Sequence, residues 1–530
     1  MCIRQNIVLV ICMVMTMILI QNLNAQTADT VSVTSGIIRG TAGLQPGIRV
    51  FKGIPYAAPP VGDLRWRPPQ PVQDWQSIRN ADRFGPRCTQ SRIFDDMIFR
   101  DEMSEDCLYL NVWTPAKTAG ERLPVMVWIH GGAFIAGSGS EPRQDGELLA
   151  CKGAVIVSMN YRLGIFGFFS HPDLTKESEH NASGNYGLMD QIAAIRWVKE
   201  NIGTFGGDPD NITIFGESAG SHSVCALMAS PLAQGLFHRA IGESGALFGH
   251  PPASLKERED AGAEFANSLC ATTIGELRRK SADDILAAAP GNYSHHSPII
   301  DGYVLPEAVD SIFKKGRQAH VPLLAGWNGD EGKMSVIFAK ERPSITNFTE
   351  RAQNIFNDKA PFFLKLYPAN TDSQTFRSAV DYAGDQFMGY ETWKWLETQL
   401  TTGKSQVYRY SFNQTPLADP KANIGGVLME EFGARHAGEI EYVFGAFPLI
   451  GISWRDDDKK LSDLIMLYWT NFARTGNPNG PGLPKWPEYG TDDSFQVMHL
   501  VGDRSCSASD LNRDRYIFLD ENQEWWKTRE

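Results

Sequence analysis

A serine lies between a short apolar segment and the start of a predicted helix. Residues 212–215 are typical of a buried strand, and Gly216-Glu217-Ser218-Ala219-Gly220 follows them directly. The next residues predict a helix as far as Met228. A strand that turns sharply into a helix exposes the serine hydroxyl, and small residues two positions before and after it let the chain bend without clashes. The pattern favours Ser218 as a nucleophile; a serine that only caps the helix is the alternative.

Further strands and a helix surround this turn in the sequence. Residues 125–130, 154–159 and 321–325 are short apolar runs, each typical of a buried strand. Apolar residues between Leu188 and Ile202 recur at spacings of three and four, which predicts one buried face of a helix. Strands alternating with helices predict an α/β fold with a large, mostly parallel central sheet covered on both faces. The Pro- and Gly-rich residues 30–75 predict a small antiparallel sheet at its edge.

A second loop has the composition of an oxyanion-binding site. His130-Gly131-Gly132-Ala133 follows a predicted strand, where this kind of fold places half of its oxyanion hole. The main-chain N–H groups of Gly131, Gly132 and Ala219 are the predicted donors to the oxyanion of a tetrahedral intermediate. Losing one such donor costs on the order of a hundredfold or more in rate. A pair of glycines occurs in many loops, but its combination with the serine turn favours catalysis.

These segments resemble the type-B carboxylesterases, which include cholinesterases and bile-salt-type lipases. The similarity extends over nearly the whole chain after the leader. It includes FKGIPY from Phe51, EDCLYLN from Glu105, NYR from Asn160, GNYG from Gly184 and FGGDP from Phe205. The resemblance implies the α/β-hydrolase fold, and one such domain over residues 26–530. It also implies an enzyme that cleaves carboxylic esters through an acyl-enzyme intermediate, with no metal or organic cofactor.

The resemblance also implies the two partners of the nucleophile. Gly329-Asp330-Glu331-Gly332 has Glu331 at the family's acid position, and His436 precedes a GEIEYVFG segment as the family's catalytic histidine does. The chain order Ser218, Glu331, His436 is the order expected of this fold. Asp330 stays open as the acid from the residues alone. The assignment requires His436 to lie within hydrogen-bond reach of Ser218.

Departures from the family narrow the expected substrate. Choline-binding members hold a quaternary ammonium with a tryptophan between their first two disulfide cysteines, and no tryptophan lies between Cys88 and Cys107 here. This argues against a cholinesterase. Ala133 stands where many members have glycine, which predicts a tighter pocket with its N–H retained. We expect a small-molecule substrate, a small or medium neutral ester. The alternatives are a lipase on long acyl chains and a binding or adhesion protein without catalysis.

Cys88 and Cys107 match the first disulfide of the family, whereas Cys270 has no cysteine at the short distance that the second would require. Cys225 follows the serine turn on its helix and is expected to be a buried, unreactive side chain. No CxxC spacing or convergent set of ligands predicts a metal.

Other polar residues near the turn have simpler interpretations. His222 is expected to be packed, and His295 and His296, in a loop rich in Ser, Pro and Gly, are expected to be exposed. Glu217, beside the nucleophile, either shapes the local field or is a structural carboxylate.

The first 25 residues predict a cleaved signal peptide. An apolar run at 7–20 follows Arg4, and Leu23-Asn24-Ala25 offers a cleavage site. We therefore expect a secreted or periplasmic protein with no transmembrane anchor; an uncleaved anchor is the alternative. The chain has 50 basic and 62 acidic residues, and the leader contributes only Arg4, so the mature net charge is −13. An acidic chain argues against nucleic-acid partners.

Overall fold

The computed structural model describes most of the chain. The described residues are 30–91, 94, 97–99, 101–249, 252–289, 296–416, 423–451, 453–491 and 493–523. The predicted signal peptide, residues 1–25, and His295 lie outside them.

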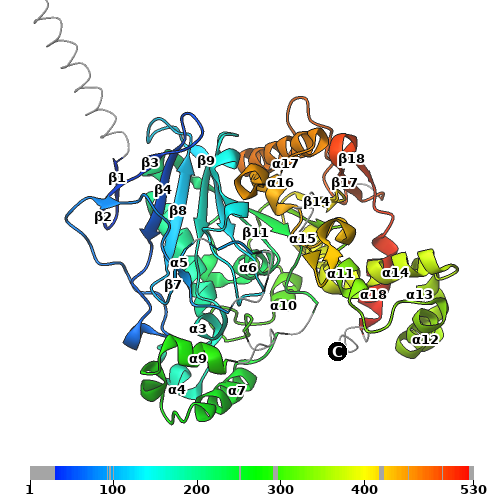
Figure 1. The fold of residues 1–530 in the computed structure, drawn as a ribbon, viewed down its shortest axis with the longest axis horizontal. Helices are drawn as coiled ribbons and strands as arrows, with labels where there is room; N and C mark the ends of the chain where they lie inside the picture. Colours follow the sequence, from blue (N-terminus) through cyan, green and yellow to red (C-terminus); the bar gives the residue numbers. More distant parts are fainter. Residues whose placement is uncertain are drawn as a thin grey trace, which may run out of the picture.

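A mixed sheet of eleven strands forms the centre of the molecule (Figure 1), in the order β18-β17-β14-β13-β12-β11-β9-β10-β8-β4-β3. The strands from β10 to β17 in this order pair in parallel, and antiparallel pairs close both edges. In chain order the strands are β3 (Thr41–Ala42), β4 (Arg49–Pro55), β8 (Tyr109–Thr114), β9 (Leu123–Ile129), β10 (Val155–Met159), β11 (Gly207–Glu217), β12 (Arg239–Glu243), β13 (Leu323–Asn328), β14 (Val407–Phe412), β17 (Gln496–Leu500) and β18 (Cys506–Ser509). The predicted α/β fold is therefore confirmed.

Helices cover both faces of this sheet because its central strands are apolar on both sides. Along β9, Val125, Val127 and Ile129 belong to one core cluster, while Met126 and Trp128 belong to another. Successive side chains of a strand point to opposite faces, so the two clusters lie on opposite sides of the sheet. The first cluster includes α5 (Tyr186–Asn201) and α6 (Ala219–Ala229), and the second includes α16 (Ile440–Phe444) and α17 (Asp456–Thr475).

A small sheet stands at the N-terminal end of the described chain. It consists of β1 (Thr30–Val33), β2 (Gly36–Arg39) and β5 (Arg79–Asn80). Strands β1 and β2 pair antiparallel, as predicted, but β5 pairs with β2 in parallel. The other strands of the Pro- and Gly-rich opening, β3 and β4, join the edge of the main sheet instead.

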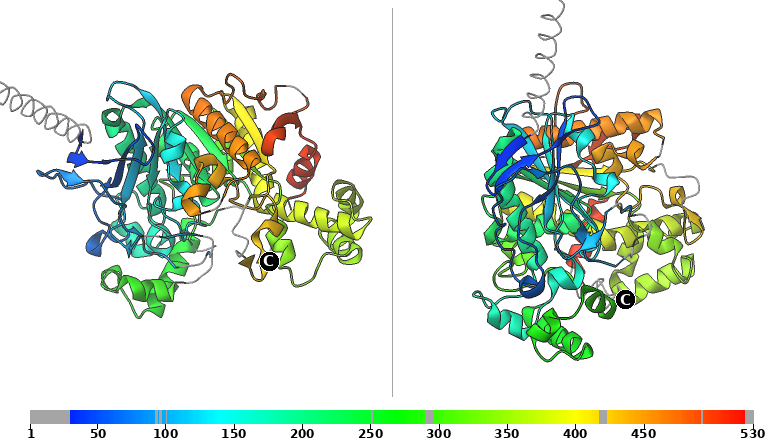
Figure 2. Two further views of the ribbon diagram at one scale, coloured as in Figure 1. Left: turned by 45° about the horizontal axis from the view of Figure 1, so that its top comes forward. Right: turned by 60° about the vertical axis from the view of Figure 1, so that its left-hand side comes forward.

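Two helical insertions interrupt the sheet order. The first, between β12 and β13, contains α7 (Leu255–Ser268), α8 (Ile274–Arg278), α9 (Ala282–Ala288) and α10 (Val309–Lys314). The second, between β13 and β14, contains α11 (Lys333–Ile337), α12 (Ile345–Phe356), α13 (Ala360–Leu366), α14 (Asp372–Gly384), the π-helix η7 (Asp385–Gly389) and α15 (Tyr390–Thr402). Figure 2 shows α12 to α14, in yellow-green, extending away from the sheet. Within the described ranges, no helix combines the length and the apolar character needed to cross a bilayer.

Shorter elements complete the connections. They are α2 (Glu147–Ala150), α3 (Gly164–Phe168), α4 (Pro172–Glu177), α18 (Arg513–Glu521), β6 (Arg87–Cys88), β7 (Met103–Ser104), β15 (Asn423–Ile424) and β16 (Val427–Leu428).

Candidate active site

Ser218 occupies a strained turn between β11 and α6. Its backbone has φ 55° and ψ −121°, a conformation that non-glycine residues adopt at a cost of about 1–3 kcal/mol. The turn is possible because its flanking residues are glycines. A Cβ on Gly216 would lie 2.5 Å from the carbonyl oxygen of Ile129, and one on Gly220 would lie 2.0 Å from the same atom. The turn therefore presses against the end of β9, where the His130 loop begins.

Three side chains distant in sequence meet at this turn. The Nε2 atom of His436 lies 2.9 Å from the Oγ atom of Ser218, and its Nδ1 atom lies 2.8 Å from Oε2 of Glu331. Ser218 follows β11 and Glu331 follows β13, so both lie at the carboxyl edge of the parallel strands. His436 lies in the segment before α16. A hydrogen-bonded chain thus runs from a hydroxyl through an imidazole to a carboxylate.

Further contacts hold Glu331 in place. Its Oε1 atom accepts hydrogen bonds from the Ser244 hydroxyl at 2.6 Å and from the Asn328 main-chain N–H at 3.0 Å. Asp330, the alternative acid, is directed elsewhere: it binds Arg377 at 2.6 Å and the N–H of Ala434 at 3.0 Å. The sequence analysis missed Ser244, which follows β12 with φ 56°. Its position after a buried strand next to β11 is the only signal that pointed to it.

Glu217 is a second carboxyl group close to His436. Its Oε1 atom lies 3.3 Å from Nε2 of His436, and its side chain is buried. Burial raises the pKa of Glu217 well above its ordinary value. Burial lowers the pKa of His436, but the nearby carboxyl groups of Glu217 and Glu331 and the hydrogen bond that His436 donates to Glu331 raise it by more, so the net shift is upward. Glu331 contacts Nδ1 of His436, whereas Nε2 of the same ring faces Ser218, so Glu331 is the candidate acid of the site.

The predicted oxyanion donors lie around the same serine. A Cβ on Gly131 would lie 3.2 Å from Cβ of Ser218, so the His130 loop runs directly beside the nucleophile turn. Gly132, Ala133 and Phe134 all have positive φ, and the carbonyl of Gly132 accepts from the N–H groups three and four residues later. Ala219 is the first residue of α6, where N–H groups have no partner inside the helix. The loop with Gly131 and the first residue of α6 therefore both lie next to Ser218.

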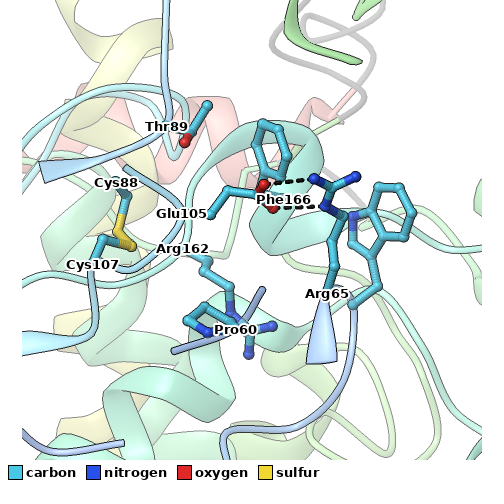
Figure 3. Close-up of a pocket in the computed structure, with 9 residues that line it drawn as sticks. Pro60, Arg65, Cys88, Thr89, Glu105, Cys107, Arg162 and Phe166 are labelled. Carbon is cyan, nitrogen blue, oxygen red and sulfur yellow. Dashed lines mark hydrogen bonds and ion pairs between the residues drawn. A yellow bond between two sulfur atoms is a disulfide. The ribbon is translucent and has the colours of Figure 1, made fainter. Parts of the chain in front are cut away.

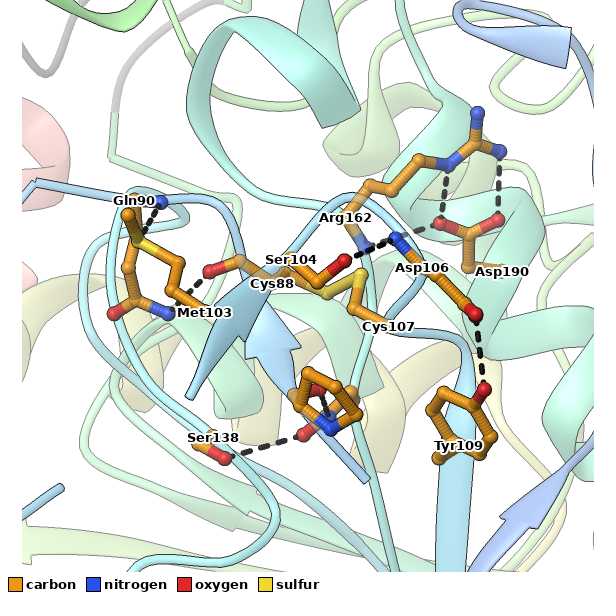
Figure 4. Close-up of a disulfide and its surroundings, with 12 residues drawn as sticks. Cys88, Gln90, Met103, Ser104, Asp106, Cys107, Tyr109, Ser138, Arg162 and Asp190 are labelled. Carbon is orange, nitrogen blue, oxygen red and sulfur yellow. Dashed lines mark hydrogen bonds and ion pairs between the residues drawn. A yellow bond between two sulfur atoms is a disulfide. The ribbon is translucent and has the colours of Figure 1, made fainter. Parts of the chain in front are cut away.

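The predicted disulfide between Cys88 and Cys107 is confirmed, with the Cα atoms 5.0 Å apart (Figure 4). The segment between the two cysteines contacts the His130 loop through Gln90. The Gln90 amide donates to the carbonyl of Gly137 and accepts from the N–H of Gly137, both at 2.8 Å. The disulfide loop therefore supports the loop that contains Gly131 and Gly132. Of the remaining cysteines, Cys225 is free and buried, as expected.

Several of the motifs that define the resemblance are structural. Arg65 forms a two-point ion pair with Glu105 of the EDCLYLN segment, beside a small pocket next to the disulfide (Figure 3). Arg162 of the NYR segment binds Asp190 at 2.7 Å through two nitrogen atoms (Figure 4). These ion pairs hold the connecting segments around the sheet in place. They belong to the scaffold and not to the candidate site at Ser218.

Two histidines differ in how well their surroundings were predicted. His222 is packed, as expected, with both ring nitrogens in hydrogen-bonding contacts. His296 was expected to be exposed and is buried at 4% exposure, so that prediction is wrong. It lines a small cavity together with Arg258, Phe265 and Phe169, between α3 and α7, a position that the polar composition of its loop does not reveal. Across the described ranges, no group of three or more His, Cys, Asp or Glu residues is arranged to hold a metal ion.

Comparison with known proteins decides the family. The model of the carboxylesterase family matches residues 27–518. The chain belongs to the carboxylesterase family. Fumonisin B1 esterase of Sphingopyxis macrogoltabida is 37% identical, with 88% of this chain and 86% of that protein covered. Carboxylesterase 1C of Mus musculus is 35% identical, with 93% and 92% covered.

The fold agrees with this membership. A solved structure of PNB esterase superimposes with a TM-score of 0.76 at 33% identity, and covers 93% of this chain and 100% of its own. The predicted class, an enzyme acting on carboxylic esters, is confirmed for this carboxylesterase at the level of the family.

Proposed function

We propose that this carboxylesterase hydrolyses esters through an acyl-enzyme formed on Ser218, with His436 and Glu331 as its partners. The observation that supports this most directly is the continuous chain of contacts, 2.9 Å from Ser218 to His436 and 2.8 Å from His436 to Glu331. Both distances allow proton transfer without rearrangement.

Each residue has a defined role in this mechanism. His436 removes the proton from the Ser218 hydroxyl as the oxygen attacks the ester carbonyl, and then donates it to the leaving alcohol. Glu331 stays ionised, holds the proton on Nδ1 and stabilises the imidazolium that forms. Water then attacks the acyl-enzyme, with His436 again acting as base, and the carboxylic acid leaves.

The oxyanion is stabilised by main-chain donors. In this mechanism the N–H groups of Gly131, Gly132 and Ala219 donate to the carbonyl oxygen that becomes negatively charged when Ser218 attacks. They belong to a strained turn and a loop held by Gln90, so they are oriented before the substrate binds. Such preorganisation is the largest single contribution in many acyl-transfer enzymes.

A covalent probe tests the nucleophile. We expect an organophosphonate to label the purified protein at Ser218 and to abolish hydrolysis of p-nitrophenyl acetate. The Ser218→Ala variant is expected neither to hydrolyse the ester nor to take up the label. Absence of the label and of hydrolysis in the wild-type protein, with a normal far-UV spectrum, would instead support a binding protein without catalysis.

We infer small or medium neutral esters as the substrates, since no tryptophan lies in the Cys88–Cys107 segment to bind a quaternary ammonium. Soluble p-nitrophenyl esters of graded acyl length, compared with a tributyrin emulsion, test this inference. Higher specific activity on the emulsion and on the longest chains would favour a lipase.

We also propose that residues 1–25 are a signal peptide and that the mature enzyme is exported. N-terminal sequencing of protein recovered outside the cytoplasm is expected to begin at Gln26. Recovery of the chain only from the membrane fraction with Met1 intact would favour the uncleaved anchor.

A further inference from the structure

His436 contacts the hydroxyl of the nucleophile residue, whereas His222 contacts its main chain. It lies one turn after Ser218 on α6, and its Nδ1 atom is 2.7 Å from the main-chain carbonyl oxygen of Ser218. Its Nε2 atom is 2.8 Å from Oε1 of Glu391 on α15. A carbonyl oxygen only accepts, so Nδ1 of His222 carries a hydrogen and donates it. The mechanism described above uses neither His222 nor Glu391.

The hydrogen bond from the ring is additional to the helix. The carbonyl oxygen of Ser218 already accepts the main-chain N–H of His222 at 2.9 Å, which is the ordinary first bond of α6. The helix therefore does not require a second donor at this oxygen. The ring supplies one all the same, and it acts on the same peptide unit as the candidate oxyanion donor.

That peptide unit joins the carbonyl of Ser218 to the N–H of Ala219. The unit is planar, and none of the peptide bonds in the described ranges is cis, so the two groups point in opposite directions. Fixing the oxygen fixes the direction of the N–H. A donor at the oxygen also withdraws electron density and makes the N–H a stronger donor, because linked hydrogen bonds polarise one another.

We propose that His222, supported by Glu391, is a positioning residue that orients and polarises the Ala219 N–H toward the oxyanion. This inference rests on the proposed function, in which Ala219 is an oxyanion donor. His222 touches no reacting atom in this scheme and acts only through the Ser218–Ala219 peptide.

The surroundings of His222 are built to hold the ring in one orientation. A Cβ on Gly245 would lie 2.4 Å from Cε1 of His222, so the ring occupies the space that a side chain would fill. The N–H of Gly245 donates to the hydroxyl of Thr392 at 2.9 Å, next to Glu391 on α15. The ring of Phe134, in the oxyanion loop, stands edge-on to the imidazole with centroids 6.4 Å apart. Three separate segments thus close around this side chain.

Charge makes His222 a strong donor. Burial lowers its pKa, but the charge of Glu391 and the hydrogen bonds that the ring donates to Glu391 and to the Ser218 carbonyl raise it by more, and His436 opposes this rise weakly. These are the charged groups that face the ring. The net upward shift favours the imidazolium, and hydrogen bonds from an ionised donor are the stronger ones.

Two variants of similar size test the inference. In His222→Leu the donor is lost, whereas in His222→Asn the side-chain amide can still donate to the Ser218 carbonyl. We expect Leu to lower kcat about tenfold with little change in KM, since an oxyanion donor is worth on the order of a hundredfold and the variant weakens it without removing it. Asn is expected to stay within about threefold of wild type, because one hydrogen bond at the carbonyl is kept.

A transition-state analogue separates positioning from packing. The affinity of a trifluoromethyl ketone, which forms a tetrahedral adduct with the serine, should fall in parallel with kcat/KM across the variants. The matching methyl ketone, which binds without forming a stable adduct, should bind all of them alike. Equal kinetics for Leu and Asn, or an effect on KM alone, would mean that the ring only fills space, and would overturn the inference.

Phosphonate labelling keeps this test distinct from that of the proposed function. If Ser218→Ala is still active, the proposed function fails. If His222→Leu labels fully at Ser218 and keeps wild-type kcat, only the inference about His222 fails. Labelling stoichiometry also measures the folded fraction of each variant. If His222→Leu does not fold, Glu391→Gln replaces it, with an expected loss of about threefold in kcat because the donor is weakened and kept; wild-type kcat in that variant would overturn the inference.

Discussion

Ser218 lies between two histidine–carboxylate pairs that have the same composition and opposite directions of hydrogen bonding. His436 presents Nε2 to the hydroxyl of Ser218 and is held at Nδ1 by Glu331. His222 presents Nδ1 to the carbonyl of Ser218 and is held at Nε2 by Glu391. The first ring must accept a proton, whereas the second must keep one.

The two pairs also differ in how the fold builds them. His222 lies four residues from Ser218 on one helix, so α6 sets their distance directly. Residues 218, 331 and 436 come from three separate segments, so only the sheet brings them together. The comparison indicates that the role of a histidine near a nucleophile depends on the atom it contacts, and not on its distance along the chain. Substitutions at matched positions of the two pairs test this difference.

The largest difference is expected between the two histidines. His436→Ala removes the base and should lower kcat by on the order of 10⁶-fold, as losses of triad members do. His222→Ala removes a positioning donor and should lower kcat by about tenfold. Steady-state kinetics on p-nitrophenyl acetate, corrected for labelling stoichiometry, measure both. Similar losses for the two variants would contradict the division of roles.

The carboxylates should differ in the same direction. Glu331→Gln leaves the shape of the site intact but no longer fixes the imidazole tautomer, and should lower kcat on the order of 10⁴-fold. Glu391→Gln should cost about threefold, because the carbonyl contact of His222 remains. Thermal unfolding of both variants serves as the control. A loss of kcat on the order of 10⁴-fold in Glu391→Gln, with thermal unfolding unchanged, would mean that Glu391 supports the catalytic base.

The pH dependence of kcat/KM should distinguish the two pairs, because only one of them is expected to set its acid limb. His436 must be neutral to accept the serine proton, and its pKa is raised, so kcat/KM should be lost as pH falls through a value above the ordinary one for histidine, about 6.5. Removing the charge in Glu331→Gln should move this acid limb to lower pH, while Glu391→Gln should leave it in place. Profiles of kcat/KM against pH for the three proteins measure the shift. An acid limb that moves only in Glu391→Gln would assign the titration to His222.

The smallest effect is expected at the carboxylate beside Glu331. Asp330 binds Arg377 and the N–H of Ala434, and not His436. Asp330→Asn should therefore keep kcat within about threefold of wild type, because one neutral hydrogen bond replaces a partly exposed ion pair of small energy. The same kinetic assay measures it. A loss comparable to that of Glu331→Gln would exchange the roles of the two acids.

Local features of the sequence accounted for much of the fold. The apolar runs at 125–130 and 154–159 correspond to β9 and β10, and the run at 321–325 overlaps β13. Buried parallel strands are apolar on both faces, so they stand out in composition. The helices between β13 and β14 were not predicted, since amphipathic segments of varied length around an insertion carry no signal of where they pack.

The residues of the site could be predicted from the sequence to different degrees, depending on whether their signal is local in the chain. Gly216 and Gly220 indicated a sharp turn at Ser218, because no other residue tolerates the approach of the Ile129 carbonyl. Ser244 and Gln90 were missed, since each acts through one hydrogen bond to a residue far away in the chain. The polar neighbours of His296 predict exposure, whereas the fold buries it beside a cavity that residues of α7 also line.

The sequence by itself determined the turn at Ser218, the buried strands and the family, because each depends on residues that are adjacent or repeat with a fixed period. The tertiary structure alone decided that Glu331, and not Asp330, contacts His436, and that His222 contacts both the carbonyl of Ser218 and Glu391. Neighbouring carboxylates are equivalent in composition, and the difference between them is the direction of a side chain. Only the packing of distant segments fixes that direction.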